Sequence, residues 1–278
     1  MTTLACGGRE LDLAGTAVMG ILNITPDSFA DGGIFMAPDK AVAHAITMAE
    51  QGANIIDIGG ESTRPGAQAV DVQQEMDRVL PVIEAVAASV DIPVSIDTSK
   101  PEVMRAAVSA GAGLINDVAA LQQDDAASAA GECKVPVCLM HMQGEPRTMQ
   151  ENPQYENVVS DVIAFLKQRI KVAVGAGVDQ AKLIVDPGFG FGKSLTHNMT
   201  LLNNLAEFKV LGVPILAGLS RKSMIGLALG LPVEQRLHAS VALALVAAQN
   251  GASIVRVHDV APTVQALQMW RAVSAANV

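Results

Sequence analysis

The stretch KLIVDPGFGFGK (182–193) decides the fold class. It is a short apolar run that ends in an aspartate and continues into a glycine-rich segment. Seven more runs rich in Val, Ile and Leu occur along the chain: TAVMGILNI (16–24), ANIIDIG (53–59), IPVSID (92–97), LINDVAA (114–120), VPVCLMH (135–141), PILAGLS (214–220) and SIVRVHD (253–259). Nearly continuous hydrophobicity is typical of strands that are covered on both faces, as in parallel sheets.

The segments between these runs have a helical period. Apolar residues recur three and four positions apart, for example at Val42, Ala45, Ile46 and Ala49; at Met76, Val79, Leu80 and Ile83; at Val159, Val162, Leu166 and Ile170; and at Leu237, Val241, Ala244 and Ala248. Eight alternating strand and helix units in about 260 residues predict a (β/α)8 TIM barrel, because a doubly wound sheet typically has five or six strands. We predict an α/β protein with one domain over residues 1–278, in which residues 1–15 form an N-terminal hairpin or plug at the barrel floor.

Composition and charge exclude several classes of protein. The chain has 278 residues, and 50% of them are hydrophobic, which is incompatible with disorder. Its 19 Lys and Arg against 28 Asp and Glu give a net charge of −9, without a basic run, so we expect no nucleic-acid partner.

The termini and the cysteines indicate a cytoplasmic protein. The N-terminus lacks a basic start followed by an apolar core, and no apolar stretch reaches about 18 residues, so we expect no membrane segment. Cys6, Cys133 and Cys138 are an odd number without C-x-x-C spacing, which argues against a disulfide framework and a zinc site.

Polar residues stand where the predicted strands end. In chain order they are Asn23 and Thr25; Glu61, Ser62, Thr63 and Arg64; Asp97; Asn116 and Asp117; His141; Asp186; Ser220, Arg221 and Lys222; and Arg256 with His258. Because the carboxyl ends of barrel strands open onto one mouth, these side chains are predicted to form a single site. Arg256 and His258 are two positions apart, so they share one side of their strand and can form a clamp for an anion.

Aromatic residues also gather in the predicted loops. The chain has six Phe, one Tyr and one Trp, and four Phe lie after predicted strands: Phe29, Phe35, Phe189 and Phe191. The rigid aromatic faces of these phenylalanines suggest that they form the walls of a pocket for a flat ring. The segment GFGFGKS (188–194) looks like a phosphate loop, but the required first glycine is Pro187, which excludes a Walker-type nucleotide site.

Seven motifs together closely resemble the dihydropteroate synthase family of the folate pathway. They are NITPDSFADGG (23–33), DIGGESTRPGA (57–67), SIDTSK (95–100), INDV (115–118), VDPGFGFGK (185–193), GLSRKSMIG (218–226) and VRVHDV (255–260). Ala30 departs from the serine that family members commonly carry there. The resemblance implies an SN1-like condensation of 6-hydroxymethyl-7,8-dihydropterin pyrophosphate with p-aminobenzoate, assisted by Mg2+, in a homodimer.

The resemblance also implies roles for individual residues. The pterin site is expected at Asp97, Asn116, Met140, Asp186 and Lys222. The pyrophosphate site is expected at Asn23, Thr63, Arg64, Arg256 and His258, with Asn23 as the Mg2+ ligand. Around p-aminobenzoate we expect Phe29, Thr63, Arg64, Pro65, Phe191 and Ser220, with Asp31 polarising the amine or accepting its proton. The residues expected to be catalytic are Asp97, Lys222, Arg256, His258 and Asp31.

Three other interpretations remain open at this point. A pterin-binding methyltransferase domain would share the ring-edge residues but would not use the anion clamp. A Schiff-base aldolase would use Lys222 as its nucleophile, although this lysine stands beside Arg221 in a loop-like SRKS segment. A non-catalytic pterin-binding barrel would bind ligand without turnover. Release of pyrophosphate that depends on p-aminobenzoate separates these possibilities.

Overall fold

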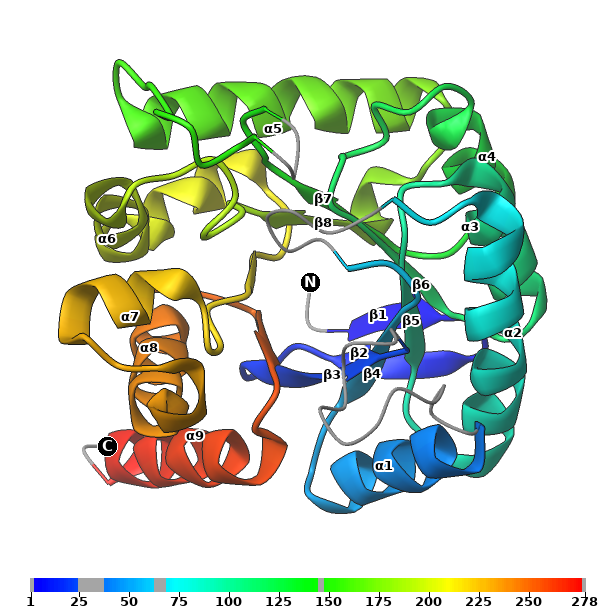
Figure 1. Ribbon diagram of the computed structural model, residues 1–278, viewed down its shortest axis with the longest axis horizontal. Coiled ribbons are helices and arrows are strands. Elements are labelled where there is room, and N and C mark those ends of the chain that lie inside the picture. Colours follow the sequence, from blue (N-terminus) through cyan, green and yellow to red (C-terminus); the bar gives the residue numbers. More distant parts are fainter. Residues whose placement is uncertain (1–2, 25–37, 63–68, 145–147, 277–278) are drawn as a thin grey trace.

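The computed structural model is a barrel of parallel strands inside a ring of helices (Figure 1). It describes residues 3–24, 38–62, 69–144 and 148–276. The barrel strands are β3 (Ala17–Asn23), β4 (Ile55–Gly59), β5 (Val94–Asp97), β6 (Leu114–Asp117), β7 (Val137–Met140), β8 (Leu183–Asp186), β9 (Leu216–Ala217) and β10 (Ile254–Val257). Their order is β8-β7-β6-β5-β4-β3-β10-β9, and a parallel bridge between Val185 and Ile215 closes the ring. The predicted TIM barrel and its eight strand positions are confirmed.

Helices follow the strands and cover the outside of the barrel. They are α1 (Pro38–Glu50), α2 (Val72–Ser89), α3 (Pro101–Ser109), α4 (Ala126–Cys133), α5 (Val158–Gly175), α6 (Leu195–Asn203), α7 (Ser223–Leu229), α8 (Leu237–Gln249) and α9 (Val260–Ala275). The short helix α7 lies between β9 and α8 and goes beyond the simple alternation that the sequence predicts. Several starts are capped by side chains: Asp71 accepts from the backbone N–H of Gln74, and Asn157 accepts from Val159 and Ser160.

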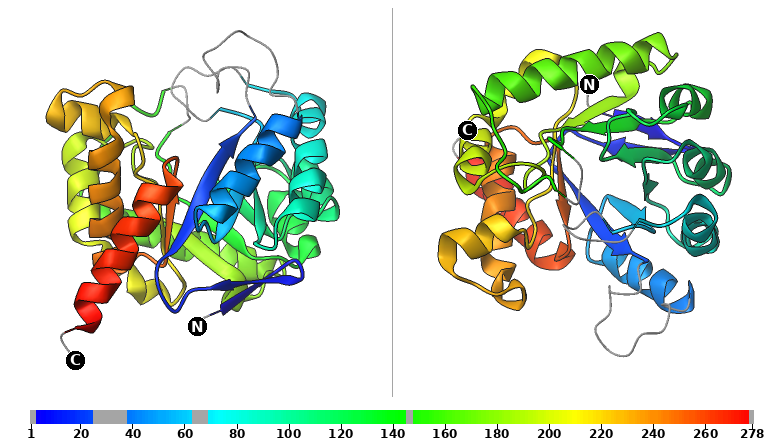
Figure 2. Two further views of the ribbon diagram at one scale, coloured as in Figure 1. Left: turned by 90° about the horizontal axis from the view of Figure 1, so that it is seen from below. Right: turned by 45° about the horizontal axis from the view of Figure 1, so that its top comes forward.

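An N-terminal hairpin closes the lower end of the barrel (Figure 2, left). Its strands β1 (Thr3–Cys6) and β2 (Arg9–Asp12) pair antiparallel. The buried side chains of Leu4, Cys6 and Leu11 pack against an apolar layer made of one residue from most barrel strands: Ala17, Met19, Ile55, Leu114, Cys138, Ile184, Leu216 and Ile254. The hairpin therefore seals an apolar floor.

The strand period places the functional layer directly above this floor. Side chains two positions apart point to the same side of a strand. Two residues after the floor, β4, β6, β8 and β10 present Asp57, Asn116, Asp186 and Arg256 to the interior. The barrel is therefore apolar at its lower end and charged toward its carboxyl end.

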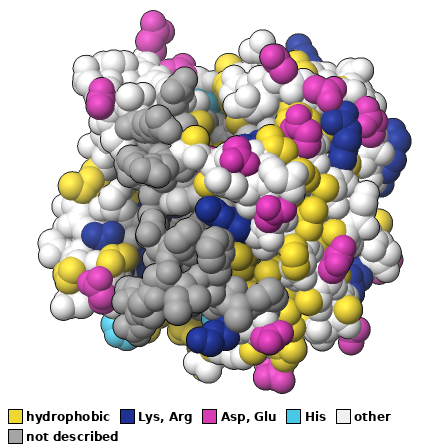
Figure 3. Space-filling model, turned by 45° about the vertical axis from the view of Figure 1, so that its right-hand side comes forward, with side chains coloured by type: hydrophobic (Ala, Val, Ile, Leu, Met, Phe, Trp, Pro, Cys, Tyr) yellow, Lys and Arg dark blue, Asp and Glu magenta, His cyan; other side chains and the backbone are white. Residues whose placement is uncertain are grey.

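The surface of the described residues carries mixed charges. On the face shown in Figure 3, acidic and basic side chains are intermixed among hydrophobic ones rather than gathered into a basic stripe. Within the described ranges, none of the helices combines the length and the hydrophobicity needed to cross a membrane.

Close packing at Gly113 gives a test of the plug. A Cβ at this position would lie 2.4 Å from the carbonyl oxygen of Cys6, so Gly113→Ala must push the hairpin away from the barrel. We expect a loss of about 1–3 kcal/mol in the free energy of unfolding, seen as a lower thermal midpoint. Gly175→Ala is the control, because a Cβ there meets nothing within 4 Å. A midpoint for Gly113→Ala equal to that of the wild type would show that the hairpin does not pack as described.

Candidate active site

A polar pocket opens at the carboxyl ends of the strands. Its lining comes from β5, β6, β7, β8, β10 and the loops after β8 and β9: Asp97, Asn116, Val118, Met140, Asp186, Phe191, Gly218, Lys222 and Arg256. The five residues expected to hold a pterin thus lie in one place, together with Arg256 and Phe191. The fold explains this, because each residue follows its strand at the same level of the barrel.

Arg256 lies between two carboxylates inside the barrel. Its Nε donates to Oδ2 of Asp57 at 2.6 Å, and its Nη2 donates to Oδ2 of Asp97 at 2.6 Å. Asn116 also donates to Asp57 at 3.1 Å. Although burial disfavours the charged guanidinium, Asp57 and Asp97 hold the pKa of Arg256 above its usual value. Arg256 is therefore an interior ion-pair residue as well as a candidate anion ligand.

Asp57 is a site residue that the sequence analysis missed. It is fully buried, and its Oδ1 has no hydrogen-bond partner in the described part of the chain. The signal was present in ANIIDIG (53–59), where an acidic residue interrupts an otherwise apolar strand two positions before Gly59. A buried carboxylate needs a partner of opposite charge. An aspartate at this position therefore predicts a basic side chain on another strand that faces it.

The remaining charged groups of the pocket have shifted pKa values. Burial raises the pKa of Asp97 to about 7, even though Arg256 is adjacent. Burial also raises the pKa of Asp186, against the effect of Lys222, and Asp186 accepts from the N–H of Gly188 at 2.7 Å. Burial lowers the pKa of Lys222 to about 8. Both Asp97 and Lys222 therefore titrate close to neutral pH.

The two phenylalanines of the β8–α6 loop have different surroundings. Phe191 lines the pocket, and the Nζ of Lys222 lies 4.6 Å from its ring centroid. Phe189 is completely buried in the core outside the barrel, so the expectation that it forms a wall for a ring is wrong. In this aromatic-poor chain its large side chain fills the space between sheet and helices, and only its backbone carbonyl, which accepts from Lys222, serves the site.

Ser220 and His258 form a pair at the upper end of β9 and β10. The Oγ of Ser220 lies 3.0 Å from Nδ1 of His258 and accepts from its backbone N–H at 3.2 Å. Ser220 is buried and is not among the residues that line the pocket. Arg221 points elsewhere and forms an ion pair with Asp259 at 2.6 Å. Ser220 therefore touches the site through His258.

Gly59, at the end of β4, lies between two oxygen donors. A Cβ added there would make ordinary van der Waals contact with Cβ of Asp97 at 3.5 Å, with Oδ1 of Asn23 at 3.6 Å and with Oδ2 of Asp97 at 3.8 Å. The same Oδ2 accepts a hydrogen bond from Arg256. Oxygen donors of this kind are what Mg2+ prefers. No group of three His, Cys, Asp or Glu side chains gathers around a common point in the described residues. A cation here would take its other ligands from substrate and water.

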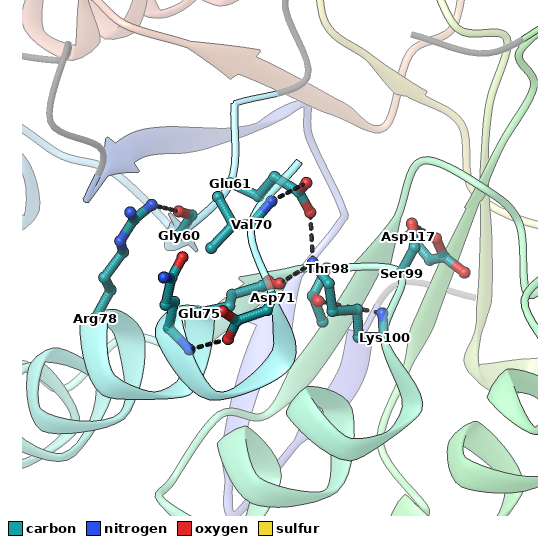
Figure 4. Close-up of polar contacts among 11 residues, drawn as sticks. Gly60, Glu61, Val70, Asp71, Glu75, Arg78, Thr98, Ser99, Lys100 and Asp117 are labelled. Carbon is teal, nitrogen blue, oxygen red and sulfur yellow. Dashed lines mark hydrogen bonds and ion pairs between the residues drawn. The ribbon is translucent and has the colours of Figure 1, made fainter. Parts of the chain in front are cut away.

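A polar network ties the connections after β4, β5 and β6 together (Figure 4). Lys100 donates at 2.5 Å to both Glu61 and the fully buried Glu75. Glu61 also accepts from the N–H of Val70 at 3.0 Å, and Ser99 donates to Asp117 at 2.5 Å. The network therefore fixes the loop that follows Asp97.

Other residues expected at the site lie outside the described residues. They are Thr25, Phe29, Asp31, Phe35, Thr63, Arg64 and Pro65.

A second groove has a volume of about 430 Å3. Its lining includes Ser223, the residue that follows Lys222 of the pocket. Besides Ser223, its lining includes Lys193, Ser194, Asn198, Met224 and Leu227.

Comparisons with known proteins identify the family of the chain. Residues 19–258 match the family model described as pterin binding enzyme. The dihydropteroate synthase of Haemophilus influenzae is 56% identical over 269 residues, which cover 97% of this chain and 98% of that protein.

Solved structures give the same result. The structure of Xanthomonas albilineans dihydropteroate synthase with 4-aminobenzoic acid has a TM-score of 0.93 and 55% identity, covering 99% of this chain and 98% of that one. The structure of the same enzyme in complex with 7,8-dihydropteroate has a TM-score of 0.90 and 52% identity, covering 98% and 99%. The barrel, the charged pocket and these similarities lead to one conclusion: the chain belongs to the dihydropteroate synthase family of pterin-binding enzymes, which are transferases of folate synthesis.

Proposed function

We propose that this pocket condenses 6-hydroxymethyl-7,8-dihydropterin pyrophosphate with p-aminobenzoate, giving 7,8-dihydropteroate and pyrophosphate. One observation carries the assignment of residues. Asp97, Asn116, Asp186 and Lys222 line one pocket inside a closed barrel, with Arg256 among them. A flat heterocycle with donors and acceptors along its edge satisfies such groups, which cost about 1–3 kcal/mol each when they are buried without a partner.

The pterin ring is bound by the lower part of the pocket. Asp97 and Asp186 accept hydrogen bonds from ring N–H groups, Asn116 donates and accepts, and Lys222 donates to the ring carbonyl and ring nitrogen. Met140 packs on the ring face. The carboxylates also stabilise positive charge on the ring while the C–O bond breaks, which is the electrostatic requirement of an SN1-like step.

The leaving pyrophosphate is bound nearer the mouth, by Asn23, Arg256 and His258, with Thr63 and Arg64 from the β4–α2 connection. Nε and Nη2 of Arg256 are engaged by Asp57 and Asp97, while Nη1 has no hydrogen-bond partner among the described residues. Nη1 can therefore donate to a phosphate oxygen without breaking the interior ion pairs. Its positive charge opposes the negative charge that develops on the leaving group.

Mg2+ is held at Asn23 in this proposal, with Asp97 on the other side of Gly59. When bound, the ion would neutralise charge on the pyrophosphate, and it needs only one or two protein ligands because phosphate oxygens and water supply the others.

The arylamine is held between Phe191 and the loops after β3 and β4 in this proposal. Phe29, Thr63, Arg64, Pro65 and Ser220 complete its pocket, and Asp31 polarises the amine or accepts its proton. The amine nitrogen attacks the methylene carbon after pyrophosphate has left, so these groups must also exclude water.

We also propose that the protein works in the cytoplasm as a homodimer. Its three cysteines are free thiols, which suits a reducing compartment. Of the ten large hydrophobic side chains that are exposed among the described residues, six belong to the segment from α7 to α9: Leu227, Leu229, Val233, Val246, Met269 and Val273. An apolar face of this kind is typical of an interface with a second copy.

The reaction and the role of Arg256 are tested by measuring pyrophosphate release with and without p-aminobenzoate. Multiple-turnover release should require both substrates, because C–O cleavage before amine attack permits at most a single turnover without the arylamine. Arg256→Lys keeps a positive charge beside the two carboxylates but loses the planar fork, so turnover should fall at least about tenfold while the affinity for free pterin stays within about threefold. An alanine would be less informative, because unpairing buried Asp57 costs about 3–5 kcal/mol.

Lys222→Met is the comparison for this assay. It should weaken free pterin by about ten- to a hundredfold, because charge-assisted hydrogen bonds contribute about 1.5–3 kcal/mol. If Arg256→Lys weakens free pterin as much as Lys222→Met does, Arg256 does not act on the pyrophosphate. Multiple-turnover release of pyrophosphate without any arylamine would contradict the condensation itself.

The affinity for pterin should be bell-shaped in pH. The raised pKa of Asp97, about 7, means that its carboxylate is charged only above that pH. The lowered pKa of Lys222, about 8, means that its ammonium is charged only below that pH. Calorimetry should therefore find the tightest binding between about pH 7 and pH 8. Asp97→Asn should remove the acidic limb, and because the ligand's own titration is common to both proteins, an unchanged acidic limb would exclude Asp97 as its source.

The dimer face is tested by sedimentation. The wild type should sediment as twice the chain mass of 28.8 kDa, and the double variant Met269→Glu/Val273→Glu on α9 should shift toward the monomer. Val210→Glu is the matched control, since Val210 is 75% exposed but lies outside the α7–α9 face. A double variant that remains dimeric would place the interface elsewhere.

A further inference from the structure

Lys193 is a buried lysine that the proposed chemistry does not use. The residue is only 3% exposed, and burial lowers the pKa of its amino group well below the usual range. Its Nζ lies 2.9 Å from Nδ1 of His141 and donates to the carbonyl oxygens of Gly188 at 2.9 Å, Phe191 at 3.0 Å and His141 at 3.4 Å. Among the described residues no carboxylate comes within ion-pair distance of it.

This arrangement fixes the curvature of the β8–α6 loop. Carbonyl groups of two loop residues converge on one amino group, so the backbone from Gly188 to Phe191 must bend around it. Gly188 has a φ of +71°, and a Cβ there would lie 1.8 Å from the carbonyl oxygen of His141. The loop is thus pressed against the end of β7, with Lys193 supplying the donors between them.

The other side of the same loop faces the pocket. The N–H of Gly188 donates to Asp186, the carbonyl of Phe189 accepts from Lys222, and the ring of Phe191 lies against the Lys222 ammonium. The loop is therefore bonded to two lysines, Lys193 behind it and Lys222 in front. The carbonyls that accept from Lys193 and the carbonyl that accepts from Lys222 are separated by only a few backbone bonds, so their positions depend on each other.

We propose that Lys193 is a positioning residue for the ring site: its amino group, caged by three carbonyls and the His141 imidazole, sets the loop so that the Phe189 carbonyl and the Phe191 ring orient Lys222. This inference rests on the proposed binding of pterin by Asp186 and Lys222. Burial lowers the pKa of His141 to about 3, so the imidazole is neutral and can accept the hydrogen bond at Nδ1. Among the described residues, no hydrogen bond or ion pair joins Arg256, at the pyrophosphate end, to the cage around Lys193.

The separation of the two ends provides the experiment. Lys193→Met removes the donors but keeps the approximate length of the side chain, and Lys193→Gln keeps an amide group that can donate in case the methionine variant does not fold. Calorimetry would measure a diphosphate-free 6-hydroxymethylpterin and, separately, inorganic pyrophosphate with Mg2+. We expect pterin affinity to fall at least about tenfold in the methionine variant and at least about threefold in the glutamine variant, and pyrophosphate affinity to stay within about twofold of the wild type.

Tyr155→Phe is the matched control. It removes a 2.7 Å hydrogen bond from the Tyr155 hydroxyl to the carbonyl of Gly192, in the same loop but away from Lys222, so pterin affinity should be unchanged within about twofold. Unchanged pterin affinity in the Lys193 variants would overturn the proposal. Equal losses for both ligands, or an equal loss in Tyr155→Phe, would also overturn it, because the effect would then be general. A wild type that binds neither ligand would contradict the proposed function, and this inference with it.

Discussion

A closed parallel barrel forces every second side chain of each strand into its interior, and the rest of this structure depends on that constraint. The strands obey it in two layers. Residues such as Ile55, Leu114 and Ile254 make an apolar floor under which the N-terminal hairpin packs. Two positions later the same strands turn charged and amide groups into the same interior. Burial of the first layer stabilises the barrel, and that stability offsets the cost of the second.

The second layer is workable because its charges nearly balance. In and beneath the pocket, the carboxylates of Asp57, Asp97 and Asp186 outnumber the basic groups of Lys222 and Arg256. Arg256 forms ion pairs with Asp57 and Asp97, each at 2.6 Å. The surplus of negative charge suits a ring that becomes cationic while its leaving group departs. The same surplus raises the pKa of Asp97, because Asp57 and Glu75 add to the effect of burial. The same group of carboxylates thus accounts for the ion pairs with Arg256 and for the raised pKa of Asp97.

Much of this could be predicted from the sequence, and the exceptions have physical reasons. The apolar strand runs and the helical periods predicted the barrel, because both patterns reflect which side chains of an element are buried. Helix α7 was missed because seven residues are too few to show a period. Phe189 was assigned to the wrong side because neighbouring loop residues can point to opposite sides, which composition does not reveal. Asp57 and Lys193 were missed because their partners, Arg256 and His141, are distant in sequence and come together only in the fold.

The glycine spacing of DPGFGFGK has a structural cause that differs from that of a phosphate loop. Gly188, Gly190 and Gly192 all have positive φ, and a Cβ at each would meet, in turn, the carbonyl of His141, the side chain of Lys222 and the carbonyl of Gln143. Every second residue is glycine because the backbone passes closely over neighbouring groups at those points. The phenylalanines between them point to the core and to the pocket. The backbone of this motif is therefore held between Lys193 and Lys222. Its carbonyl groups, rather than its N–H groups, accept the hydrogen bonds from these two lysines.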